Sequence, residues 1–90
     1  SKAMERLDKS DAKAAELKSI VTRSGAKATT AAHDSLNLVD QQRQQAKISI
    51  DQLANSRDDA FEQMKSNTDT QLDTLEGYVK KAEDEVKKFK

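Results

Sequence analysis

The sequence predicts an all-α protein of long amphipathic helices that form a coiled coil, a helical hairpin or a bundle. Three observations lead to this fold class. The chain of 90 residues has no Pro and only two Gly, so helix breakers are nearly absent. Ala, Lys, Glu, Gln and Leu, which favour helices, are abundant. No run of β-branched and aromatic residues is bounded by turn residues, so no strand is predicted.

The apolar content is small for a chain of this length. Large apolar residues number 19 of 90, while the net charge is zero. Burial of so few apolar side chains contributes little free energy to offset the conformational entropy that a single chain loses on folding. A narrow apolar stripe with balanced charge is typical of helices that complete their core on a neighbour. We therefore expect residues 1–90 to form a single helical module, either a homo-oligomer or a folded-back bundle.

The first predicted helix covers residues 2–23. Its apolar positions gather on one side, at Met4, Leu7, Ala14, Leu17, Ile20 and Val21. The Ser24–Gly25 pair then predicts a break or kink near 24–26. The alternative is a continuous helix, in which small residues such as Ala28 and Ala32 allow another helix to come close.

The second predicted helix covers residues 27–65 and carries an impure heptad seam. Its predicted interface residues are Leu36, Val39, Arg43, Ala46, Ile50, Leu53 and Met64. Arg43 interrupts the apolar pattern and has four glutamines around it. Two interpretations remain open: glutamine side chains accept its hydrogen bonds inside the seam, or Arg43 extends outward from the seam edge.

The third predicted helix covers residues 70–89 and has the cleaner seam. Its predicted interface residues are Leu72, Leu75, Val79, Val86 and Phe89. Because eight residues rather than seven separate Met64 from Leu72, the two heptad registers do not join. Residues 66–70 are also poor helix formers with N-capping side chains, which favours a turn here. The competing prediction is a local unwinding inside one long helix.

No motif for chemistry is present, so we predict a non-enzyme without cofactor or metal. His33, Asp34 and Ser35 are the residue types of a hydrolase triad, but neighbours on a helix point about 100° apart. A calcium loop begun at Asn67 lacks the required Gly and Glu. No Gly-rich phosphate loop exists. Equal numbers of acids and bases and only three aromatic residues predict no nucleic-acid binding.

Charge is uneven along the chain, which bears on how the helices pair. Residues 1–23 carry six bases against four acids, and residues 51–76 carry seven acids against two bases. This asymmetry suits antiparallel or staggered pairing of the basic ends with the acidic middle, and an unselected surface pattern explains it equally well. The absence of Cys fits a cytosolic protein and an exported one equally well, so it leaves the compartment open.

Together these patterns predict a structural, scaffolding or tethering module that assembles through amphipathic coiled-coil helix faces. Its expected partner is a second copy of the chain, another helical protein, or both. The alternative function is an amphipathic-helix binder of lipid or apolar polymer surfaces, behaving as apolipoproteins and phasins do. The segment 72–89 would serve that role, but its apolar stripe is narrow and the zero net charge gives no attraction to anionic lipid.

Overall fold

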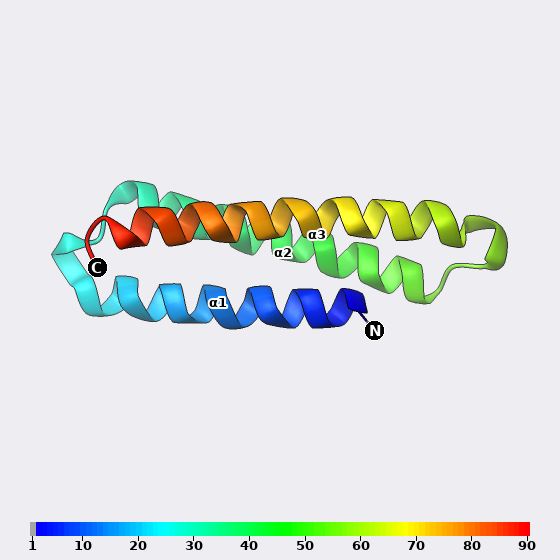
Figure 1. Cartoon of the computed structure of the whole chain (residues 1–90), viewed down its shortest axis with the longest axis horizontal. Coiled ribbons are helices and arrows are strands. Elements are labelled where there is room, and N and C mark those ends of the chain that lie inside the picture. The colour runs from blue at the N-terminus through cyan, green and yellow to red at the C-terminus, as the bar shows by residue number, and fades with distance from the viewer. Residues whose placement is uncertain (1) are drawn as a thin grey trace.

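Three helices account for nearly all of residues 2–90, which are the residues that the computed structural model describes. Helix α1 spans Lys2–Ser24, α2 spans Thr30–Ala54 and α3 spans Asp58–Lys87. Helices α1 and α3 run in the same direction and α2 runs against both (Figure 1). The bundle is a rod of 51 × 17 × 15 Å. The all-α prediction is confirmed, since residues 2–90 contain no strand.

The first predicted break lies where the sequence places it. Helix α1 ends at Ser24, and a short 3₁₀ turn, η1, follows at Gly25–Lys27. Gly25 has a φ of 54°, a left-handed conformation that costs glycine little because it has no Cβ. The Thr29 hydroxyl then caps α2 by accepting a hydrogen bond from the Ala32 amide at 3.1 Å. A continuous helix through this segment is therefore wrong.

The second break lies at residues 55–57 and not at 66–70, so the predicted helix 27–65 is split in two. Polar side chains form hydrogen bonds with the last turn of α2 at this break. The Asn55 amide donates to the Asp51 carbonyl and the Ser56 hydroxyl donates to the Leu53 carbonyl, both at 2.8 Å, which satisfies carbonyls that the last helical turn leaves free. Asp58 and Asp59 occupy the first turn of α3, where negative charge is favourable.

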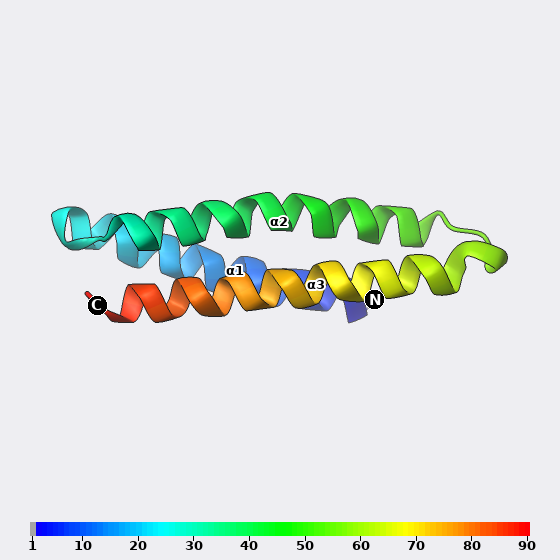
Figure 2. The ribbon, with the colours of Figure 1, turned by 90° about the horizontal axis from the view of Figure 1, so that it is seen from above.

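Residues 66–70 lie inside α3, which corrects the predicted turn. Their hydroxyls bond to carbonyls rather than ending the helix: Thr70 donates to Ser66, and the buried Thr68 lies 2.8 Å from the Met64 carbonyl and 3.1 Å from that of Ser49 on α2. The one-residue slip in register has a packing explanation. The first part of α3 lies beside α2 alone, while the rest packs against both other helices (Figures 1 and 2).

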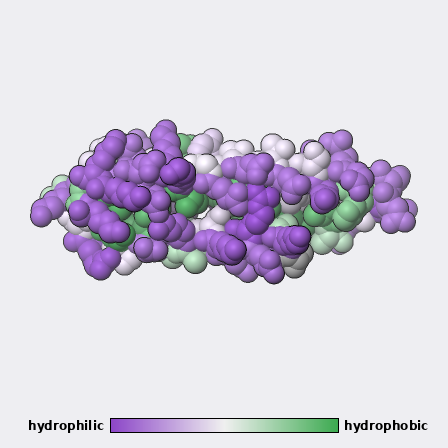
Figure 3. Space-filling model, in the orientation of Figure 1, coloured by the Kyte–Doolittle hydropathy of each residue, from purple (hydrophilic) through white to green (hydrophobic). Residues whose placement is uncertain are grey.

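A single apolar core runs along the bundle, with contributions from all three helices. The buried hydrophobic residues are Leu7, Ala14, Leu17, Ile20, Val21, Ala32, Leu36, Val39, Ala46, Ile50, Leu72, Leu75, Val79, Ala82 and Val86. Polar side chains cover most of the face that α1 and α3 form (Figure 3). Each helix is thus amphipathic and completes its core on the other two.

Candidate assembly surface

Most of the predicted interface residues pack between helices of the same chain. Leu36, Val39, Ala46, Ile50, Leu72, Leu75, Val79 and Val86 are buried in the core, while Arg43, Leu53, Met64 and Phe89 are half-buried. The heptad seams therefore join α2 and α3 to each other and to α1. That these positions also form an interface between chains stays a prediction, and a free assembly surface has to lie elsewhere on the folded bundle.

Arg43 lies at the edge of this seam. Its Nε donates to Oδ1 of Asp11 on α1 at 2.7 Å, and this bond raises the pKa of Arg43 further above its usual range. The Nε2 of the neighbouring Gln42 instead donates to Gln71 on α3, to the backbone carbonyl of Gln71 at 3.0 Å and to its Oε1 at 2.6 Å. The glutamines around Arg43 therefore do not hold its guanidinium, whose partner is a carboxylate on the adjacent helix.

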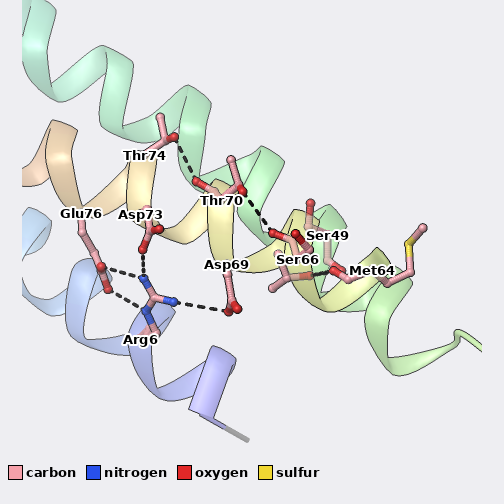
Figure 4. A network of polar contacts seen from close by, with 10 residues as sticks. Arg6, Ser49, Met64, Ser66, Asp69, Thr70, Asp73, Thr74 and Glu76 are labelled. Carbon is pink, nitrogen blue, oxygen red and sulfur yellow. Dashed lines mark hydrogen bonds and ion pairs between the residues drawn. The ribbon is translucent and has the colours of Figure 1, made fainter. Parts of the chain in front are cut away.

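A cluster of ion pairs fixes the register of α1 on α3 near the start of the chain (Figure 4). The Arg6 guanidinium binds Glu76 at 2.8 Å and Asp73 at 2.6 Å, with Asp69 at 3.6 Å. The hydrogen bonds with Glu76 and then Asp73 raise the pKa of Arg6 further above its usual range. In this cluster a base of the first segment pairs with the acidic middle, but α1 and α3 are parallel, so the expected antiparallel pairing is wrong for these two helices.

Two further ion pairs join α1 to the other helices. Lys13 binds Glu83 on α3 at 2.6 Å, and this hydrogen bond lowers the pKa of the Glu83 carboxyl. Lys18 binds Asp40 on α2 at 2.6 Å. Because these charges pair within the chain, they are less available to a partner.

The outer face of α2 differs from the outer faces of α1 and α3. Three of its 14 exposed residues are charged, against seven of 11 on α1 and 11 of 17 on α3. Of those three acids, Asp40 pairs with Lys18 and Asp51 pairs with Lys47 at 2.8 Å, while Asp34 forms no ion pair among residues 2–90. A charge-poor surface is typical of the centre of a protein interface, because little charge has to be desolvated there.

A row of exposed residues at heptad spacing runs along this face, offset from the buried seam and with two large apolar members. We call it the α2 stripe; its seven residues follow alternating spacings of three and four, and all are exposed: Ala31, Asp34, Leu38, Gln41, Gln45, Ile48 and Gln52. The side chains of Leu38 and Ile48 are 36% and 51% exposed. The only other large hydrophobic residue so exposed in residues 2–90 is Phe61. Leu38 and Ile48 fall outside the core register, which is the sequence signal that could have identified this stripe.

A smaller apolar surface lies at the end of the rod where the chain turns from α2 into α3, beyond the first residues of α1. A groove of about 430 Å³ is lined there by Ala3, Met4, Ile50, Leu53, Ala54, Ser56 and Phe61. Figure 3 shows hydrophobic residues gathered at this end of the rod, beyond the start of α1. The Phe61 side chain is 43% exposed. This tip groove is a second candidate contact surface, although it is confined to one end.

The three consecutive residues of hydrolase-triad type do not form a site in the structure. His33 and Asp34 are exposed whereas Ser35 is buried, so these side chains do not converge. No group of three or more metal-ligating His, Cys, Asp or Glu residues exists within residues 2–90. No helix in this range has both the length and the hydrophobicity to cross a membrane.

No known protein family, curated protein or solved structure matches the chain. The exposed surface is poorest in charge along α2, where the α2 stripe holds one charged residue, Asp34, among its seven.

Proposed function

We propose that the chain is a structural scaffolding module that assembles with a second copy of itself through the α2 stripe. The observation that carries this proposal is the contrast between α2, whose exposed face is charge-poor and holds Leu38 and Ile48, and the charged outer faces of α1 and α3. A rigid rod that joins to another rod can hold attached segments at a set spacing. The three-helix core is complete within one chain, so assembly adds to a folded unit rather than creating it.

The energetics favour a weak, reversible contact. Burial of Leu38 and Ile48 on both copies contributes about 1 kcal/mol for each side chain, given their partly exposed starting state. The 25 residues of α2 give a contact about 37 Å long at 1.5 Å per residue. One helix width of about 10 Å along that length buries about 370 Å² on each copy, or about 740 Å² in all, which is below the area of standard specific interfaces and typical of a weak contact. The four side chains together contribute about 4 kcal/mol, so we expect a dissociation constant in the millimolar range.

Assembly through the ends of the rod is less favourable. The cross-section of 17 × 15 Å limits an end-to-end contact to about 255 Å² on each copy, which is less than a contact along α2 buries. The side of the rod offers a surface three times as long. This difference in available area is why the proposal uses α2 and not the tip groove.

Sedimentation equilibrium over a concentration series tests the proposal. The wild-type chain should show a monomer–dimer equilibrium, and Ile48→Asp should shift it to monomer because a carboxylate would have to be desolvated. Phe61→Asp is the matched control: it changes the other exposed large hydrophobic residue, off the stripe, and should leave the mass unchanged. A wild-type chain that stays monomeric at every concentration would overturn the proposal.

Circular dichroism on the same variants separates assembly from folding. Because Ile48 and Phe61 are exposed, both aspartate variants should keep the helix content of the wild type. Ile50→Asp should instead unfold the bundle, since Ile50 is 6% exposed and its replacement buries a charge. Loss of helix in Ile48→Asp alone would show that its effect on mass comes from unfolding.

Binding to an apolar surface is the second candidate function, and the tip groove around Phe61 favours it. The apolar faces of the helices are otherwise buried in the core, so broad surface binding would require the bundle to open. Co-flotation with neutral phosphatidylcholine vesicles tests this function. Loss of binding in Phe61→Asp but not in Ile48→Asp would assign it to the groove, and no binding by the wild type would exclude it for that surface.

A further inference from the structure

Six of the seven residues of the α2 stripe, from Asp34 to Gln52, are arranged symmetrically about a point midway between Gln41 and Gln45. Leu38 and Ile48 lie at equal distances along the helix on either side of that point, as do Asp34 and Gln52. We propose that the second copy docks with its α2 antiparallel to the first, with a twofold axis at that point. This inference rests on the proposed function, because it names the orientation and register of the same assembly.

In the antiparallel register, apolar side chains face apolar side chains and glutamines face glutamines. Leu38 of each copy lies opposite Ile48 of the other, which gives two identical apolar contacts on either side of the axis. At the axis, Gln41 lies opposite Gln45 of the second copy. Each glutamine amide offers both donors and an acceptor, so the central pair can satisfy itself as water leaves. The contact is thus apolar at two places and amide-bonded at its centre.

Charge discriminates this arrangement from a parallel one. In a parallel dimer every stripe residue faces its own copy, so Asp34 would face Asp34 of the second chain and two carboxylates would repel each other. In the antiparallel dimer Asp34 faces Gln52, whose amide can donate to the carboxylate. The helix macrodipoles also oppose each other only in the antiparallel arrangement.

The substitution Gln52→Lys tests the orientation, because it should have opposite effects on an antiparallel and a parallel dimer. Gln52→Lys should strengthen the antiparallel dimer about fivefold, because each introduced ammonium faces Asp34 of the other copy and the symmetry makes two exposed ion pairs. The same substitution would weaken a parallel dimer, since the two lysines would face each other. Gln63→Lys, which adds the same charge on an exposed position of α3, should leave the dissociation constant unchanged. An unchanged or weaker Gln52→Lys dimer would overturn the proposal.

Cysteine cross-linking gives an independent measurement, and the absence of native Cys leaves no competing thiol. A chain with Gln41→Cys, mixed with a mass-tagged chain with Gln45→Cys and oxidised gently, should give mainly the mixed disulfide. In the antiparallel register, position 41 of one copy lies about 6 Å along the helix from position 41 of the other copy, and the same holds for position 45. Cysteines at the same position are therefore farther apart than cysteines at positions 41 and 45. Predominant homodisulfides would overturn the orientation. A wild-type chain that is monomeric in sedimentation would instead overturn the proposed function, so the two failures are distinguishable.

Discussion

The Lys13–Glu83 pair shows how a single half-buried ion pair makes stability depend on pH. The hydrogen bond from Lys13 lowers the pKa of the Glu83 carboxyl in the folded state. A lowered folded-state pKa means that the pair stabilises the fold above the unfolded-state value of about 4.5. That contribution is lost as the pH falls through the folded-state pKa, because the carboxyl is then neutral in both states.

We therefore expect Lys13→Met to melt at a lower temperature than the wild type near neutral pH and at the same temperature near about pH 2. Methionine keeps the apolar stem of the side chain, so the difference reports the charge. Thermal melts followed by circular dichroism at a series of pH values measure it. Lys9→Met is the matched control, since Lys9 is exposed and forms no ion pair among residues 2–90. A melting difference for Lys13→Met that persists in acid would contradict the assignment.

The helix boundaries show what the sequence could predict at the scale of elements and what it could not. The break near Gly25 followed from local chemistry, because a glycine beside a serine favours a turn and a left-handed φ. The break at 55–57 was missed because Asn55 and Ser56 lie within a heptad pattern that continues to Met64. The predicted turn at 66–70 was wrong because Thr68 packs against α2 and bonds within the helix, which local propensity does not encode.

The two glycines give a matched test of these boundaries. Gly25→Ala should destabilise the bundle by about 1 kcal/mol, because alanine is strained at a φ of 54°. Gly77→Ala should stabilise it by up to about 1 kcal/mol, because Gly77 lies inside α3 and alanine is the better helix former. A Cβ at either position meets nothing within 4 Å, so packing does not confuse the comparison. Urea denaturation measures both changes; effects of the same sign would contradict these helix assignments.

At the scale of the whole molecule, the buried seam and the exposed stripe explain why the candidate site was only partly predictable. A heptad seam identifies residues that pack against another helix, but it does not say whether that helix belongs to the same chain. Leu36, Val39 and Ile50 pack within the chain because two turns fold the helices back. Folding then leaves Leu38 and Ile48 outside, so the α2 stripe becomes recognisable only once the buried faces are known.

The shape of the assembled molecule follows from which surface is used. Docking along α2 adds a second rod beside the first, so the longest dimension should remain near that of the 51 Å monomer while the cross-section grows. Docking through the tip groove or the opposite end would instead nearly double the length. Small-angle X-ray scattering at concentrations that populate the dimer measures this dimension, with Ile48→Asp as the monomeric reference. Because the two arrangements differ so much in length, a dimer close to twice as long as that reference would rule out the α2 stripe as the assembly surface.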